Sequence, residues 1–83
     1  MTETTLSTAI AAHIETAAFL APGELQHAEA LFSAGIIDSV NLLELVVFAE
    51  GLCQLSVPPE DIRLEYWDSV EKISAYLARR RAA

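Results

Sequence analysis

The chain has 83 residues, 53% of them hydrophobic, which is enough for one compact core and too few for two. A domain of this size has little room for a deep cavity, so its length argues against a self-sufficient enzyme for a sizeable substrate. The net charge at pH 7 is −7, and no lysine or arginine occurs before Arg63. This anionic stretch repels nucleic acid and anionic lipid. It either steers the protein towards partners with basic patches or only keeps it soluble.

The cysteine content and the N-terminal pattern indicate a compartment. Cys53 is the only cysteine, so neither a disulfide framework nor a zinc site is available, and the cytoplasm is the expected location. The N-terminus has no basic region before its apolar residues, and acids interrupt the apolar stretches. Neither an export signal nor a membrane-inserting segment is therefore predicted.

A first helix is predicted over residues 4–20, because Leu6, Ile10 and Ile14 recur at the spacing of one helical face. The Ala-Pro-Gly run at 21–23 is expected to end this helix. A long connection follows.

A second helix is predicted over residues 39–53, and its apolar residues cover more than half of its circumference. Val40, Val47 and Phe48 cannot all point the same way as Leu42. The apolar side chains outside the core either form a docking face or pack on a second side of the helix in a small bundle.

The last third of the chain predicts a short helix and a long one. The prolines after Val57 argue against a strand and lead into a short helix over residues 60–64. The final helix is predicted over residues 69–80, with Asp68 and Glu71 in the form of a capping box. The expected architecture is all-α: a four-helix bundle with three main helices and a short third one, in a single domain of residues 1–83.

The sequence does not assemble a catalytic centre. Ser39 lacks the glycine-flanked elbow of a nucleophilic serine, and neither His13 nor His27 is marked as its base. No cluster of His, Cys, Asp and Glu has the spacing of metal ligands, and no glycine-rich phosphate loop occurs. The chain is therefore expected to be no enzyme and to bind no metal.

The segment from Gly35 to Val40 places a serine hydroxyl at the start of a helix, after a glycine-containing loop. Free amides and the positive end of the helix dipole stabilise an anion at such a position. Ser39 is therefore a suitable attachment site for a phosphodiester. The other interpretation is that Asp38 or Ser39 only caps the second helix.

From Leu31 to Leu77 the chain resembles the acyl, peptidyl and D-alanyl carrier proteins, whose attachment motif is Asp-Ser followed by Leu, Val or Met. The residues that carry the resemblance are Leu31-Phe32, Gly35 to Ser39, Val57-Pro58, Trp67-Asp68 and Lys72-Ile73. The segment around Ser39 is most similar to that of stand-alone aminoacyl and D-alanyl carriers. Members of this family have the fold of an acyl-carrier four-helix bundle.

The resemblance implies a function for Ser39. It would receive 4'-phosphopantetheine from coenzyme A through a phosphopantetheinyl transferase, and the thiol of the arm would carry a thioester. Asp38 would belong to the motif that the transferase recognises. Val40, Glu44 and Val47 match positions on the second helix where family members meet partner enzymes. The alternative for each is plain helix surface or boundary packing. The implied partners are an adenylation or acyl-loading enzyme and a downstream acyl-transferring or condensing enzyme, and the carrier itself would be a monomer without catalysis.

The chain also departs from the family. Gln54 stands where many members have a glycine, so a left-handed residue or a different turn must end the second helix, and Gly51 is expected to share in this. The second helix has few acids, which favours apolar docking over charge and argues against a fatty-acid synthase. Cys53 is expected to be a small buried side chain and not a reactive thiol.

The cargo and the context stay open at the level of the sequence. The resemblance favours an amino acid in D-alanylation-like or nonribosomal-peptide metabolism, with fatty or polyketide cargo as the second choice. The length suggests a free-standing carrier, although a domain cut from a larger synthase would look the same. A different class is an unmodified helical protein-interaction module, and the least favoured is a small enzyme with Ser39 as nucleophile.

Overall fold

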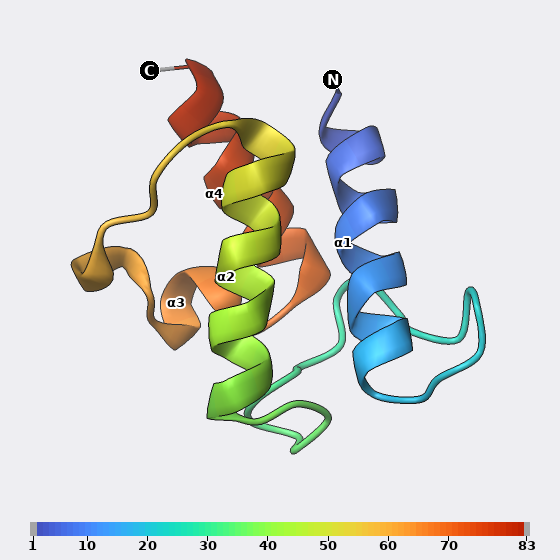
Figure 1. Ribbon diagram of the computed structural model, residues 1–83. Coiled ribbons are helices and arrows are strands. Elements are labelled where there is room, and N and C mark those ends of the chain that lie inside the picture. Colours follow the sequence, from blue (N-terminus) through green and yellow to red (C-terminus); the bar gives the residue numbers. More distant parts are fainter. Residues whose placement is uncertain (1, 83) are drawn as a thin grey trace.

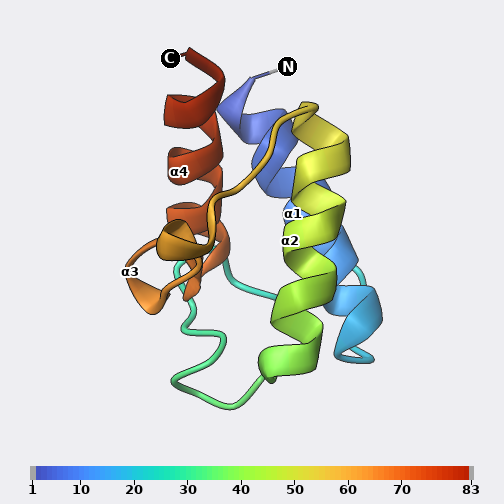
Figure 2. The same cartoon turned by 60° about the vertical axis from the view of Figure 1, so that its left-hand side comes forward.

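The computed structural model describes residues 2–82, and within them the chain is helical without strands. Its elements are α1 (Glu3–Ala17), α2 (Ser39–Cys53), the 3₁₀ turn η1 (Pro59–Asp61), α3 (Leu64–Trp67) and α4 (Val70–Ala82). Figures 1 and 2 show α1, α2 and α4 side by side, with the start of α1 and the end of α4 at the same end of the molecule. The predicted all-α bundle of three main helices and one short helix is confirmed.

The core lies between the three long helices, and α1 packs mainly against α4. Leu6, Ile10 and Ile14 of α1 are buried, as their spacing predicts, and share one core with Ile73 and Leu77 of α4. Burying a side chain of this size contributes about 1.5–3 kcal/mol. Because α1 has only 15 residues, this buried face and not helix propensity holds it in place.

The first helix ends at Ala17, so the predicted end at residue 20 is wrong. Phe19 takes a left-handed φ of 59°, and the Leu20 amide donates to the Glu15 carbonyl at 2.8 Å, which reverses the chain. The Glu15 carboxylate, itself buried, then accepts from the amide of Leu25 at 3.0 Å. The chain leaves the helix before it reaches the Ala-Pro-Gly run.

The second helix ends at Cys53, where its predicted bound lies, and Gln54 is left-handed with a φ of 53°. The Gln54 and Leu55 amides both donate to the Glu50 carbonyl. Of the two endings that the sequence left open, a left-handed residue or a different turn, the structure shows the left-handed residue. The prediction that Gly51 helps to end this helix is wrong, because Gly51 lies inside α2.

The short helix predicted over residues 60–64 is also wrong, because this stretch divides into η1 and α3 with an extended Arg63 between them. Trp67 causes the division. Its side chain is fully buried, and its indole Nε1–H donates to the carbonyl of Asp61 at 2.8 Å. This anchor draws the helical turn towards Trp67 and leaves η1 as a separate turn.

The capping box predicted at the start of the last helix does not form. The Ser69 hydroxyl accepts from the Lys72 amide at 3.0 Å and caps α4, which begins at Val70 and extends to Ala82, two residues beyond the predicted end. The Asp68 carboxylate reaches across the fold instead. It accepts from the amides of Phe32 at 2.8 Å and Ser33 at 3.1 Å, and from the Ser33 hydroxyl.

The junction between α3 and α4 therefore fixes the long loop that leads to α2. The Leu31 amide donates to the Asp68 carbonyl at 2.8 Å, and the Glu71 amide donates to the His27 carbonyl at 2.9 Å. Burial by itself raises the pKa of Asp68, but the hydrogen bonds from Ser33, Phe32 and Leu31 together outweigh it and hold this pKa below its ordinary value. The carboxylate is thus ionised at neutral pH and organises the loop.

Candidate functional site

The start of α2 shows how Ser39 is presented. Asp38 occupies the N-cap: its carboxylate accepts from the Asn41 amide at 2.9 Å, and its own amide donates to the Asn41 side chain at 3.3 Å. Of the two capping residues that the sequence allowed, Asp38 is therefore the cap. Ser39 is the first helical residue and is exposed. The role of Asn41 was not foreseen, although Asp-x-x-Asn is a variant of the capping-box pattern.

The loop before α2 brings Ser39 to the surface. Leu31 and Ile37 are buried and anchor the two ends of a turn, while Gly35 between them has a φ of 76°. The Ile36 amide closes this turn by donating to the Leu31 carbonyl at 2.8 Å. Because the anchor at Ile37 is only two residues away, the path of the chain into α2 is defined.

The start of α2 at Ser39 is chemically suited to carry a phosphodiester. The Ser39 hydroxyl takes part in no side-chain hydrogen bond among residues 2–82, whereas the Ser33 hydroxyl is held by Asp68. A helix start leaves the amides of Ser39 and Val40 without acceptors inside the helix, at the positive end of its dipole. An exposed hydroxyl beside such amides is therefore suited to carry a phosphate.

The outer face of α2 is apolar. Val40, Leu43 and Val47 are 63%, 60% and 67% exposed and follow one another at spacings of three and four, while Leu45 and Ala49 lie in the core. Glu44 is exposed beside this row. The interpretation that α2 packs on two sides does not account for this row. Sequence reasoning named Val40, Glu44 and Val47 but missed Leu43, whose spacing from Val40 and Val47 was the available signal.

A shallow groove runs between α1 and α2. It has a volume of about 410 Å³ and is lined by His13 from α1 and by Leu43, Glu44, Val47 and Phe48 from α2. The His13 and Phe48 rings stack with centroids 4.4 Å apart and planes 18° from parallel. His13 is half-buried at the edge of the core, and Phe48 gives its ring a defined aromatic partner.

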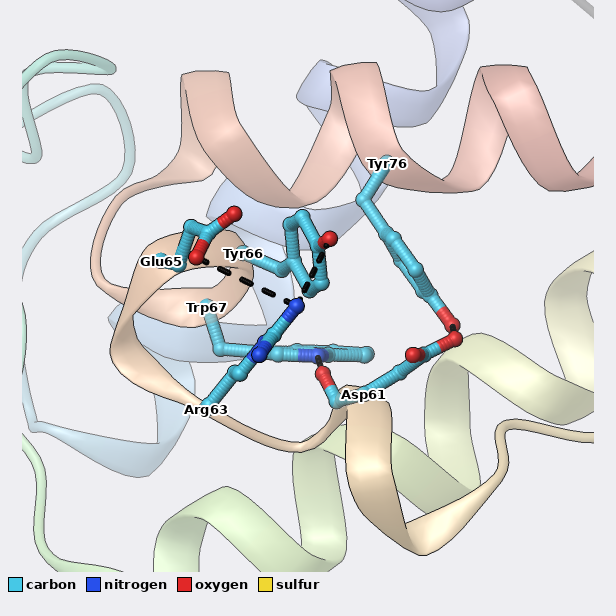
Figure 3. A network of polar contacts seen from close by, with 6 residues as sticks. All are labelled: Asp61, Arg63, Glu65, Tyr66, Trp67 and Tyr76. Carbon is cyan, nitrogen blue, oxygen red and sulfur yellow. Dashed lines mark hydrogen bonds and ion pairs between the residues drawn. The ribbon is translucent and has the colours of Figure 1, made fainter.

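A network of side chains joins η1 and α3 to α4 (Figure 3), with the Tyr66 and Tyr76 rings stacked between α3 and α4. The Tyr76 hydroxyl donates to the Asp61 carboxylate at 2.6 Å, and Arg63 donates to the Tyr66 hydroxyl at 3.0 Å. Burial, with the hydrogen bond to Asp61, raises the pKa of Tyr76 to about 12. The network fixes α3, on which Leu64 is 51% exposed, a residue that the sequence did not single out.

Among residues 2–82, no group of three or more His, Cys, Asp and Glu side chains is placed to hold a metal ion. In the same residues, no helix has both the length and the apolar character that crossing a membrane requires. Cys53 is half-buried, and this burial raises the pKa of its thiol.

Comparisons with known proteins place the chain beside one kind of protein. No protein-family model matches it. It is 35% identical over 51 residues to the D-alanyl carrier protein of Lactococcus lactis subsp. lactis (strain IL1403). This match covers 61% of the chain and 65% of the relative. The chain is 42% identical over 45 residues to the D-alanyl carrier protein of Streptococcus uberis (strain ATCC BAA-854 / 0140J), covering 54% and 57%.

A third relative, the D-alanyl carrier protein of Streptococcus suis (strain 05ZYH33), is 38% identical over 45 residues, or 54% of this chain and 57% of its own. The chain thus spans less than two thirds of the length of the curated relatives it matches. These matches agree with the resemblance to carrier proteins, and the all-helical fold is consistent with it. The curated relatives, at 35–42% identity over about half of the chain, support its assignment to the acyl and peptidyl carrier protein family.

Proposed function

We propose that the chain carries an acyl or aminoacyl group as a thioester, on a 4'-phosphopantetheine arm attached to Ser39, and presents it to partner enzymes. The observation that supports this most directly is the exposed Ser39 hydroxyl at the capped start of α2, in a chain similar to D-alanyl carrier proteins. When attached, the arm supplies the terminal thiol that bears the cargo.

The residues at the start of α2 have separate roles in this proposal. Ser39 provides the oxygen of the phosphodiester, and the first-turn amides stabilise its negative charge. Asp38 holds the start of the helix in place through Asn41 and belongs to the surface that a phosphopantetheinyl transferase recognises. In this proposal the chain itself catalyses nothing and is a substrate of the enzymes that modify and load it.

The partners follow from the same proposal. An adenylating or other acyl-loading enzyme charges the thiol, and a downstream enzyme removes the cargo, both in the cytoplasm and both meeting a monomeric carrier. Val40, Glu44 and Val47 form the docking surface on α2, supported by the exposure of this row and of Leu64 on α3. The cargo is an amino acid in D-alanylation-like metabolism, as the names of the relatives suggest, or an acyl group in natural-product biosynthesis.

Transfer of a fluorescent phosphopantetheine from a coenzyme A analogue tests the proposal. A broad-specificity transferase is expected to label the wild type and Ser56→Ala and to leave Ser39→Ala unlabelled. Ser56 is the matched control because it is also an exposed serine whose side chain has no hydrogen bond among residues 2–82.

The second candidate function is an unmodified interaction module that uses the apolar row Val40, Leu43 and Val47. Absence of label from all three folded proteins would contradict the carrier role and favour this module.

A further inference from the structure

The groove between α1 and α2 begins one turn from Ser39. Ser39, Leu43 and Val47 are spaced by four and therefore form one row along α2. The groove residues Leu43 to Phe48 follow Ser39 by four to nine positions, which is roughly 6–14 Å along the axis at 1.5 Å per residue. An arm attached at Ser39 reaches this groove when it extends along the surface of α2 towards Phe48.

The lining of the groove selects a kind of occupant. Leu43, Val47 and Phe48 offer apolar surface, and the His13 ring, stacked on Phe48, contributes to the lining from α1. Glu44 is the acidic residue of this lining. Because the groove is shallow and open, it suits a small apolar group whose charged end stays in water, and not a long acyl chain that requires enclosure.

We infer that this groove is the resting site of an aminoacyl group carried on the Ser39 arm, with its ammonium group bound by the Glu44 carboxylate. The inference rests on the proposed function, because it takes the arm at Ser39 as given. Charge complementarity identifies the occupant: an aminoacyl thioester has a free ammonium beside a small side chain, and the groove places one carboxylate beside apolar surface.

The test compares two cargoes of nearly equal size on ¹⁵N-labelled protein. The transferase loads arms that end in an alanyl or a propionyl group through a hydrolysis-resistant amide, and intact mass verifies one arm per chain. The alanyl arm is expected to shift the amides of Leu43, Glu44 and Phe48 and the ring signals of His13. The propionyl arm, which lacks the ammonium, is expected to shift them less.

Two variants separate the carboxylate from general charge. Glu44→Gln is expected to lower the occupancy of the groove by the alanyl arm roughly two- to five-fold, the range for an exposed ion pair, and so to reduce its shifts to those of the propionyl arm. Glu60→Gln, which removes an exposed acid from η1, is expected to leave the shifts unchanged.

Three results would overturn the inference. These are shifts confined to the residues next to Ser39, shifts concentrated in buried Leu45 and Ala49, and equal effects of the two cargoes. If the mass shows no arm, the proposed function fails by itself, and alanyl-pantetheine amide is titrated into the same protein instead. Shifts of the groove residues with this free probe would support the site, and no shifts there would overturn it.

Discussion

Replacement of Asp68 probes the link between the α3–α4 junction and the loop that presents Ser39. Asp68→Ala removes three hydrogen bonds at once, from the amides of Phe32 and Ser33 and from the Ser33 hydroxyl. The two amides lie in a part-buried site, so water replaces the carboxylate only in part. Asp68→Ala is therefore expected to lower the free energy of unfolding more than a surface substitution does.

The magnitude follows from the number of bonds. A hydrogen bond contributes about 0.5–1.5 kcal/mol net, and more when one partner is charged, so Asp68→Ala is expected to lower the free energy of unfolding by about 2–4 kcal/mol. Asp68→Asn keeps one acceptor oxygen and is expected to lose about half as much. Glu60→Gln, an exposed control, is expected to stay within about 0.5 kcal/mol of the wild type.

Urea unfolding followed by the fluorescence of Trp67 measures these differences, because Trp67 is the only tryptophan and is fully buried. Amide hydrogen exchange at Phe32 and Ser33 supplies a local readout. Both amides are expected to exchange faster in Asp68→Ala than in the wild type.

The pH dependence has a definite sign. Hydrogen bonds lower the pKa of Asp68 in the folded state despite its burial. The ionised carboxylate therefore contributes fully to the stability of the fold above about pH 3.9, the pKa of an aspartate in the unfolded chain. The contribution is lost as the pH falls through the lower, folded pKa. The difference in free energy of unfolding between the wild type and Asp68→Asn is therefore expected to be constant from pH 7 to about pH 4 and to shrink below about pH 4. A gap under about 0.5 kcal/mol at pH 7, or one that persists unchanged in acid, would refute the reasoning.

Four further predictions concern other parts of the fold. Gln54→Gly is expected to stabilise the protein by about 1 kcal/mol, because glycine takes a left-handed φ without steric cost. Gly51→Ala is expected to stabilise it by about 0.5–1 kcal/mol, because alanine favours a helix interior. A lower urea midpoint for either variant would contradict the assigned backbone. Tyr76→Phe is expected to cost about 1–2 kcal/mol through loss of the bond to Asp61. Because the pKa of Tyr76 is raised to about 12, this contribution is present below the unfolded tyrosine pKa of about 10 and is lost as the pH rises through about 12; ultraviolet titration without such a late tyrosine would contradict it. Cys53, whose thiol pKa burial raises, is expected to react with a disulfide reagent at pH 8 more slowly than an unfolded control, and equal rates would contradict this.

Local signals in the sequence account for the features that were predicted well. The apolar spacing of Leu6, Ile10 and Ile14 places α1 on the core, and the cap at Asp38 sets the start of α2. At Gln54, where the chain must turn without a glycine, the sequence left a left-handed residue or a different turn open, and the structure has the left-handed residue. These features depend on residues a few positions apart.

Contacts between distant segments explain what the sequence did not predict. Asp68 has the spacing of a helix cap, but its carboxylate binds amides 35 and 36 positions earlier in the chain. Trp67 moves the short helix because its indole must satisfy a hydrogen bond while buried. Such partners are set by tertiary packing, which a local pattern does not contain.

The acidic composition has a similar explanation. The sequence suggested either steering of partners or solubility for the acids, yet several of them accept from backbone amides in loops. Glu15 binds the Leu25 amide, and Glu50 binds the Val57 amide at 2.8 Å. The groove likewise depends on His13 and Phe48, which are 35 positions apart and become neighbours only when α1 and α2 pack.

Locating the arm by mass spectrometry tests the central claim most directly. After treatment with coenzyme A and a broad-specificity transferase, cleavage after glutamate releases the peptide of residues 30–44, which contains both Ser33 and Ser39. The account predicts that this peptide gains one phosphopantetheine and that its fragment ions place the added mass on Ser39. An unmodified peptide from a folded protein, or fragments that place the arm on Ser33, would contradict it.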